Sequence, residues 1–356
     1  MKFLFLTSGA HVPSTRFRML PLATRLREQG HTCHVSHSFP EKYDHFPKIG
    51  FRPSQWLKRL LRRRDVLRAR WGGYDAVILE RELFDNASYD VEAALRRVAR
   101  TLVLDIDDGV FLKFPEKFRQ LLDMADLVVA GNRLLAEWAS AVNRNVVIIP
   151  TCIDTSDYQP RPVTPPSDSA RATGGRPVIG WMGTSGNIAY LREIAGPLRS
   201  LAARHDFEFQ VIAGDRGVLD ELPLEGVNVR FRPWKPESES TDILEFDIGV
   251  MPLSDDPWSR YKCGLKLLQY MAIGIPGVAS PVGVNADIIS QGIDGFLAST
   301  GSEWETALAE LLASPQRRQQ MGTAARQTVL GRYSLEVNLP RWLEAVGQTV
   351  RRACDA

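Results

Sequence analysis

Short apolar runs alternate with helical patterns along most of this chain, and that alternation limits the folds open to it. In the first half, stretches with helical periodicity separate apolar runs at 3–7, 32–36, 76–79, 102–104, 127–130 and 146–149. Strands joined through helices pair in parallel, and helices then cover both faces of the sheet. The pattern therefore predicts an α/β fold with a doubly wound parallel sheet.

The alternation stops at a linker-like segment and then starts again. Residues 161–176 are rich in proline, serine, threonine and glycine and lack apolar periodicity. Beyond them, helical patterns fill most of 303–352, and a second sheet is predicted from apolar runs at 178–181, 207–213, 227–231 and 248–251. We therefore expect two domains, at 1–160 and 177–335.

Composition narrows the class of protein and its partners. The formal net charge is +2, so no overall positive field argues for nucleic acid. The four cysteines have neither the spacing of a metal site nor the density of a disulfide framework, which fits a reducing cytoplasm. The apolar run at 3–6 is too short for a signal peptide, and no segment approaches the roughly 20 apolar residues of a membrane span. We expect a cytoplasmic protein, either soluble or peripheral to the membrane.

The segment 262–285 has the most specific local pattern. Residues 263–273 read as a buried helix closed by Gly274, an apolar strand follows Pro276, and a turn at Gly283 leads into another helix. This order of helix, strand and glycine turn sets up two possible ligand contacts, one at the start of the helix and one at the turn.

Two lysines stand at the start of that predicted helix. Lys262 and Lys266 are four residues apart, so they would share one helical face in the first turns. Backbone N–H groups there lack partners within the helix, and together with two cations they predict an anion site. The alternative is that both lysines extend from a surface helix into solvent.

Asp105, Asp107 and Asp108 follow the apolar run at 102–104. The carboxyl ends of parallel strands line the binding site of such a sheet, and Asp105 and Asp107 would share one side of an extended chain. These carboxylates could hydrogen-bond the hydroxyl groups of a bound substrate, bind a divalent metal, or form a solvated turn that caps the next helix.

The aspartate motif also looks like the nucleophile loop of haloacid dehalogenase-type phosphatases, in which the first aspartate attacks phosphorus. That family expects threonine or valine where Gly109 stands, and its domain normally starts with this strand. Here the strand comes after a long α/β run, so the phosphatase is a lesser alternative.

The pattern of 262–285 closely resembles the donor-binding segment of glycosyltransferase family 4, the group 1 glycosyltransferases. The resemblance extends over nearly the whole chain, through motifs at 13–18, 105–108, 130–132 and 149–154. It implies the GT-B fold, in which an acceptor-binding and a nucleotide-sugar-binding Rossmann-like domain face each other across a cleft. It also implies that a last helix, within 336–356, crosses back to the first domain and that the anomeric configuration of the sugar is retained.

The resemblance also implies a set of site residues. The catalytic residues would be Asp107, in the place of a cleft histidine, and the diphosphate-binding lysines, Lys262 and Lys266. The donor-binding residues would be Gly9, Gly183, Thr184, Ser185, Trp234, Gly264, Gln269, Gly283, Val284 and Asn285. The acceptor-binding residues would be Ser14, Arg16, Arg18, Asp105 and Asp108. No cofactor or metal is expected, because lysines and helix dipoles can neutralise the leaving diphosphate.

Simpler roles compete at some of these positions. Ser14 could be only a helix cap, and Arg18 could point into solvent. Trp234, which follows a predicted strand where the family packs the nucleotide base, could instead be an ordinary packing aromatic.

The chain departs from the family pattern at two acidic positions. Many members have two glutamates separated by seven residues, where this chain has Tyr261 and Gln269. A glutamine carbonyl can still accept hydrogen bonds from the ribose, but it has no charge. The family often supplies arginine and lysine from the first turn of the second domain, where this chain has Thr184, Ser185 and Asn187. A degenerate homologue that binds nucleotide or serves as a partner subunit is therefore the alternative function.

Residues 55–71 form the one concentrated basic stretch. Leu57, Leu60, Leu61 and Leu67 are predicted on one helical face, with Lys58, Arg59, Arg62, Arg63 and Arg70 over the rest. This arrangement suits an anionic membrane surface and a lipid-linked acceptor. The alternative is a helix that buries its leucines on the first domain and solvates its arginines.

Overall fold

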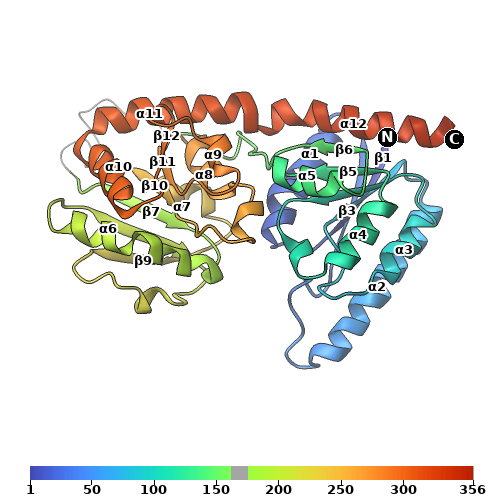
Figure 1. The fold of residues 1–356 in the computed structure, drawn as a ribbon. Helices are drawn as coiled ribbons and strands as arrows, with labels where there is room; N and C mark the ends of the chain where they lie inside the picture. The colour runs from blue at the N-terminus through green and yellow to red at the C-terminus, as the bar shows by residue number, and fades with distance from the viewer. Residues whose placement is uncertain (162–174, 356) are drawn as a thin grey trace. The chain divides into compact units, whose positions relative to one another are not determined.

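The computed structural model of the chain describes residues 1–161 and 175–355, which form two compact α/β units (Figure 1). Unit 1 contains Met1–Cys152, Tyr261–Cys263 and the chain from Leu335 onward, and unit 2 contains Ile153–Arg260 and Gly264–Ser334. Residues 162–174 of the predicted linker lie outside the described residues.

Unit 1 is built on a six-stranded sheet of order β2-β1-β3-β4-β5-β6, in which all neighbours pair in parallel. Its strands are β1 (Lys2–Thr7), β2 (Thr32–His37), β3 (Ala76–Glu80), β4 (Leu102–Ile106), β5 (Leu127–Ala130) and β6 (Val146–Ile148). Its helices are the π-helix η1 (Thr15–Met19), α1 (Leu20–Glu28), α2 (Phe51–Trp71), α3 (Asp90–Arg96), the short η2 (Val110–Leu112), α4 (Pro115–Met124), α5 (Arg133–Ser140) and α12 (Leu335–Asp355).

Helices α1 and α12 cover one face of this sheet. Phe3 and Phe5 of β1 pack against Trp342 of α12, with ring centroids 5.6 and 6.4 Å from the indole. Leu4 and Leu6, which point to the other face, are buried as well. Burial on both faces is why the strands are continuous apolar runs rather than alternating ones.

Unit 2 has its own six-stranded parallel sheet, of order β12-β11-β10-β7-β8-β9. Its strands are β7 (Val178–Met182), β8 (Glu208–Ala213), β9 (Val229–Pro233), β10 (Ile248–Met251), β11 (Gly277–Ala279) and β12 (Gly295–Leu297). Its α-helices are α6 (Arg192–Ala202), α7 (Glu239–Ile243), α8 (Leu265–Ala272), α9 (Asn285–Ile288), α10 (Gly301–Ala313) and α11 (Pro315–Thr328). It also contains the 3-10 helices η3 (Ser185–Leu191) and η4 (Leu219–Glu221) and the π-helix η6 (Val329–Tyr333), and the 3-10 helix η5 (Ser259–Tyr261) ends at the first residue of the segment assigned to unit 1.

A row of glycines lets α8 approach the sheet of unit 2. Gly249 of β10 is in register with Gly277 of β11 and Gly180 of β7. A Cβ on Gly249 would come within 2.3 Å of the Tyr270 ring, and one on Gly277 within 2.3 Å of Leu267. Tyr270 and Leu267 belong to α8, so the missing side chains fix how close this helix lies to the strands.

The predicted basic helix forms within α2, and its faces contradict the alternative in which the leucines pack on the first domain and the arginines are solvated. Lys58 and Arg62 are buried, whereas Leu60 and Leu67 are exposed. Among the described residues, no helix is both long and apolar enough to cross a membrane.

Candidate functional site

Gly264 sets the start of α8, the helix expected to receive the diphosphate. Gly264 is the N-cap residue and has φ 70°, a left-handed conformation that glycine adopts without strain. The helix therefore begins at Leu265, and Lys262 lies before it, in the segment that belongs to unit 1. The prediction that Lys262 and Lys266 share a helical face is wrong, because the left-handed glycine separates them. Only Lys266 lies in the first turn of α8.

Lys266 lies along Gly183, the glycine that follows β7. A Cβ on Gly183 would come within 2.5 Å of Lys266 Cε, so the absence of a side chain makes room for the lysine stem. Its ammonium lies 5.7 Å from the centre of the Trp181 ring. The ammonium thus stays beside the first turn of α8 and near the end of β7.

The turn at Gly283 brings Asn285 close to the same helix start. Gly283 has φ 56°, and a Cβ there would come within 2.4 Å of the Arg260 carbonyl oxygen. Buried Asn285 donates through Nδ2 to the Ser280 carbonyl over 3.1 Å. Its Oδ1 makes no hydrogen bond among the described residues and lies 3.6 Å from where a Gly264 Cβ would be. A buried acceptor without a donor is costly, and a ligand hydroxyl or amide would satisfy it.

The neighbouring residues of this half have structural contacts. Val284 is buried beside Gly264. Thr184 Oγ1 accepts a hydrogen bond from Asn187 Nδ2 over 2.8 Å, and Ser185 Oγ accepts one from the Asp215 backbone N–H over 3.1 Å. These bonds fix the turn after β7. The expected contact between this turn and the donor stays a prediction.

Gln269 and Trp234 are both bound to one buried carboxylate, that of Glu239. Gln269 Nε2 donates to Glu239 Oε1 over 2.7 Å and to the Tyr158 hydroxyl over 2.8 Å. Trp234 Nε1 donates to Glu239 Oε2 over 3.2 Å. Because the amide nitrogen of Gln269 faces Glu239, its carbonyl oxygen must point the other way. Two predicted donor residues are therefore oriented by an acid that the sequence pattern did not reveal.

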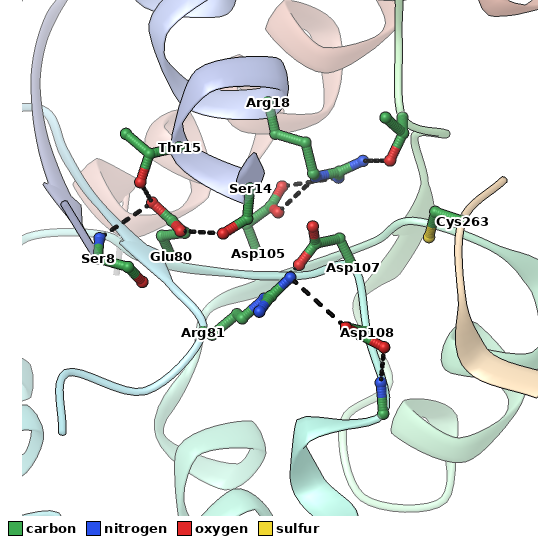
Figure 2. Close-up of polar contacts among 12 residues, drawn as sticks. Ser8, Ser14, Thr15, Arg18, Glu80, Arg81, Asp105, Asp107, Asp108 and Cys263 are labelled. Carbon is green, nitrogen blue, oxygen red and sulfur yellow. Dashed lines mark hydrogen bonds and ion pairs between the residues drawn. The ribbon is translucent and has the colours of Figure 1, made fainter. Parts of the chain in front are cut away.

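In unit 1, Asp105 and Arg18 bind each other inside the domain. Arg18 donates from Nε to Asp105 Oδ1 over 2.8 Å and from Nη2 to Oδ2 over 2.9 Å, and both side chains are buried (Figure 2). Arg18 also donates to the Ile149 carbonyl. Burial alone lowers the pKa of Arg18, but the Asp105 carboxylate outweighs it, and the pKa is raised. Arg18 thus neither faces solvent nor offers its guanidinium to an acceptor, and Asp105 is not placed as a nucleophile.

Asp107 forms an ion pair with Arg81. Arg81 Nε donates to Asp107 Oδ1, and the two side chains are 11% and 10% exposed. Burial raises the pKa of Asp107, but Arg81 outweighs it and lowers the pKa below its usual value. The residue is therefore a carboxylate at neutral pH. Asp105 is buried, and Asp107 is only 10% exposed and paired with Arg81, which rules out the solvated-turn interpretation for both.

Arg81 has an unusual backbone conformation that aims its side chain at the aspartates (Figure 2). Its φ is 55°, a left-handed value, and no other described residue except glycine has positive φ. Its N–H donates to the Asp105 carbonyl over 2.8 Å, and its Nη2 lies 4.0 Å from Asp108 Oδ2. Such strain persists where surrounding contacts enforce it, and it is common at functional sites.

Glu80, the residue before Arg81, organises the first strand–helix junction. It accepts hydrogen bonds from the Ser14 and Thr15 hydroxyls and from the Ser8 backbone N–H (Figure 2). The Ser14 side chain makes no cap hydrogen bond with the helix, contrary to the simple alternative. Ser14 instead ties the start of η1 to the end of β3.

Gly9 and Arg16 flank that junction. A Cβ on Gly9, whose φ is 156°, would collide with the Glu41 side chain at 2.6 Å. Arg16 is half-buried, with its guanidinium 5.0 Å from the Phe17 ring centre. Gly9 therefore accommodates Glu41 in unit 1, and its expected contact with the donor is a prediction.

Tyr261–Cys263 packs on unit 1 beside the aspartates. Asn132 Nδ2 donates to the Tyr261 carbonyl over 3.0 Å, and a Cβ on Gly131 would come within 2.6 Å of Cys263 Sγ. Tyr261 also packs edge-on against Phe111 at 4.8 Å. Lys262 is thus held by unit 1 through its two neighbours.

The residues that sequence reasoning missed fall into two groups. Glu80 and Arg81 stand at the end of the predicted strand at 76–79, so the rule applied to Asp105 and Asp107 would have found them. Glu239 and Tyr158 have no comparable signal, because their partner Gln269 is distant in the chain. No group of three potential metal-ligating side chains exists among the described residues.

Comparisons with known proteins agree on the architecture. Residues 176–314 match the family described as glycosyl transferases group 1. No curated protein matches the chain in sequence. A glycosyltransferase from Rickettsia africae has a TM-score of 0.70 at 15% identity, over 98% of this chain and 99% of that one.

Two further solved structures have the same fold. Sucrose-phosphate synthase from Thermosynechococcus elongatus has a TM-score of 0.70 at 16% identity, over 99% of both chains. HepE from Anabaena, solved in complex with UDP, has a TM-score of 0.67 at 18% identity, over 98% of this chain and 100% of that one. The predicted α/β fold class with two parallel sheets, GT-B, is confirmed.

Proposed function

We propose that the chain is a glycosyltransferase of group 1, as the family match over residues 176–314 and the GT-B fold support, and that it moves a sugar from a nucleotide-sugar donor to an acceptor hydroxyl with retention of anomeric configuration. One observation carries the proposal. Lys266 is held along Gly183 in the first turn of α8, where unpaired backbone N–H groups also favour an anion. This is the chemistry that a departing nucleoside diphosphate requires.

In the proposed reaction, the bond between the anomeric carbon and the diphosphate oxygen breaks, and the electron pair leaves with the diphosphate. Lys266 and the N–H groups of α8 stabilise that negative charge, with Lys262 as a second cation. The acceptor hydroxyl attacks the resulting oxocarbenium-like carbon from the same face, and a phosphate oxygen takes its proton. No protein nucleophile is needed.

Unit 2 is proposed to hold the nucleotide. Gln269 presents its carbonyl oxygen to the ribose hydroxyls, because Glu239 and Tyr158 occupy its amide nitrogen. Trp234, fixed through the same Glu239 carboxylate, packs against the base. Asn285 Oδ1 is an additional acceptor near the start of α8.

Unit 1 is proposed to bind the acceptor through fewer residues than the sequence suggested. Arg18, Asp105 and Ser14 make contacts within unit 1, so they support the site rather than touch the acceptor. Arg16, Asp107 and Asp108 remain as direct contacts. Asp107 accepts hydrogen bonds from a sugar or acceptor hydroxyl, since a carboxylate of lowered pKa is a poor general base at neutral pH.

No divalent metal is required in this proposal. Asp105 is bound by Arg18 and Asp107 by Arg81, so using the two carboxylates as metal ligands would break two buried ion pairs. Lys266 and the dipole of α8 supply the positive charge instead.

The acceptor is a glycan, a lipid-linked molecule or a small molecule. A lipid-linked acceptor would place this protein at the cytoplasmic face of a membrane without spanning it. Nucleic acid is not among the proposed partners, because the net charge is close to neutral.

A degenerate homologue that binds nucleotide without turnover is the second candidate. The absence of acidic residues at 261 and 269 favours it. Glu239 counts against it, because a carboxylate is still present beside Gln269.

A nucleotide-sugar screen separates the two candidates. Thermal shift identifies the donors that bind, beginning with UDP-glucose because HepE was solved with it. Hydrolysis or transfer is then measured on each donor that binds. Turnover supports the glycosyltransferase, binding without turnover supports the degenerate homologue, and no binding by any nucleotide sugar contradicts both.

A further inference from the structure

Helix α2 turns its polar side chains toward the domain. Its buried residues are Ser54, Lys58, Arg62, Asp65 and Ala69. Lys58 Nζ donates to the carbonyls of Lys42 and Asp44 over 2.9 and 2.7 Å. Arg62 donates to the Ser36 carbonyl and to Asp65, each over 3.0 Å. Hydrogen bonds from these two cations to backbone carbonyls, rather than an apolar stripe, therefore attach this helix to the rest of unit 1.

The opposite face of α2 is an exposed apolar stripe. It consists of Trp56, Leu60, Leu67 and Trp71, which are 67%, 49%, 58% and 75% exposed. Their spacing of four, seven and four residues places them on one side of an α-helix. Large apolar side chains lined up in this way are unusual on a soluble surface and mark a site of interaction.

Exposed arginines flank the stripe. Arg52, Arg63, Arg64 and Arg70 are exposed, and no ion pair joins them to any residue that the structure describes. The only acid in α2, Asp65, is buried. On a helical wheel, Arg52, Arg63 and Arg70 border the stripe on one side and Arg64 on the other.

We propose that this face of α2, the Trp56/Leu60/Leu67/Trp71 stripe with its four arginines, docks the protein onto an anionic phospholipid surface. Tryptophan and leucine enter the boundary between headgroups and acyl chains, where tryptophan is favoured. The arginines lie at phosphate level and pair with anionic headgroups.

The positive charge of the four arginines favours a bilayer over a second copy of this chain as the partner of α2. In a symmetric dimer through α2, the same arginines would meet one another, and like charges close together are unfavourable. An anionic bilayer instead complements both the apolar stripe and its cationic borders. The inference stands apart from the proposed chemistry, and it would explain how a lipid-linked acceptor is reached if the proposed function holds.

The test uses the full chain and vesicles of phosphatidylcholine with or without phosphatidylglycerol. We expect co-sedimentation with the anionic vesicles only, weakening as salt shortens the Debye length. Tryptophan fluorescence should shift to the blue on binding. Trp56→Phe/Trp71→Phe should abolish the shift, because these two are the exposed tryptophans among the described residues.

Two double variants and two matched controls test the face itself. Leu60→Gln/Leu67→Gln removes apolar area, and Arg63→Gln/Arg64→Gln should lower partitioning roughly 30-fold, at about fivefold per cation. Ile293→Gln, at a side chain 65% exposed in unit 2, and Arg351→Gln/Arg352→Gln, at exposed residues of α12, should leave binding unchanged. Unchanged melting temperatures exclude misfolding.

Several outcomes would overturn the proposal. The wild type could ignore anionic vesicles at low salt, or the α12 control could reduce binding as much as the α2 variant, which would mean attraction by net charge alone. A dimer in sedimentation analysis that Leu60→Gln/Leu67→Gln dissociates would make the stripe a contact between copies. Nucleotide-sugar hydrolysis is assayed without vesicles, so its failure and the failure of docking are separate results.

Discussion

Gln269 donates its side-chain amide to Glu239 over 2.7 Å, so the orientation of one predicted ribose ligand depends on a carboxylate thirty residues away. A carboxylate only accepts hydrogen bonds, and it therefore selects the rotamer in which the nitrogen faces it. Replacing that carboxylate by an amide would remove the selection without changing the shape of the side chain.

Glu239→Gln should weaken binding of the cognate nucleoside diphosphate by roughly five- to tenfold, about 1–1.5 kcal/mol, because the Gln269 amide is then free to rotate. Calorimetric titration of the nucleoside diphosphate into wild type and variant measures the two dissociation constants. The 2′,3′-dideoxy nucleotide should bind wild type and variant equally, since it has no ribose hydroxyl to donate to Gln269. Glu237→Gln, at an exposed acid two residues earlier, is the control. Equal losses with both nucleotides would mean that Glu239 is only structural.

Lys266→Ala should lower donor affinity or turnover roughly tenfold or more, because a charge-assisted contact of about 1.5–3 kcal/mol is lost. Steady-state kinetics with the donor found by the screen give the value. Lys235→Ala, at an exposed lysine of the same unit, should behave as wild type. Wild-type kinetics for Lys266→Ala on the true donor would remove this lysine from the site.

Transfer or hydrolysis should persist in excess chelator, because a lysine and a helix dipole take the place of a metal ion. The assay compares initial rates with and without EDTA. Complete loss of activity that magnesium or manganese restores would instead identify Asp105 and Asp107 as metal ligands, and the mechanism proposed above would fail.

The Arg81–Asp107 pair predicts a defined pH dependence of stability. The pKa of Asp107 is lowered in the folded state from an ordinary value of 3.8. The pair therefore stabilises the fold at pH values above that ordinary value, and its contribution disappears as pH falls through the lowered pKa. Urea unfolding at a series of pH values should show a smaller acid-side slope for Asp107→Asn than for wild type.

At neutral pH, Asp107→Asn should also reduce the free energy of unfolding by about 3–5 kcal/mol, because Arg81 is left buried without its counter-charge. Arg81→Met/Asp107→Asn removes both charges and should recover part of that loss. If the single and double variants were equally unstable, the ion pair would not be the cause.

Thiol labelling provides an independent view of the segment beside Asp107. Burial raises the pKa of Cys263 and of Cys152 to about 12, so both are thiols at pH 8. Cys354 is exposed and should be the fast-reacting cysteine when the folded protein meets iodoacetamide. Rapid alkylation of Cys263 in the peptide map would show that Tyr261–Cys263 does not stay packed on Asn132.

The order of strands and helices could be predicted because each depends on local patterns. The apolar run at 248–251 is β10 as expected, and β7 extends the predicted 178–181 by one residue. The helix expected at 263–273 is α8 (Leu265–Ala272), which begins two residues later. Periodicity identifies buried segments well and gives their ends less accurately.

The site was predicted less completely because its contacts join residues far apart in the chain. Asp105 was expected after its strand, but it lies inside β4, where Arg18 from η1 neutralises it. No pattern near residue 105 in the sequence indicates that Arg18 is its partner. Lys262 and Lys266 do not share a helical face for a different reason. Gly264 is left-handed, so α8 begins at Leu265, two residues later than the predicted start at 263.

The two faces of α2 are subject to different evolutionary constraints. Exchanging Lys58 or Arg62 would remove donors from buried carbonyls and from the Asp65 carboxylate, so folding itself selects for these residues. Trp56 and Leu67 contribute little to that selection, because most of their surface is in water already. Substitutions on the exposed face of α2 could therefore add or remove membrane docking during evolution without changing thermal stability. A more soluble variant should be obtainable by substitutions on the same face.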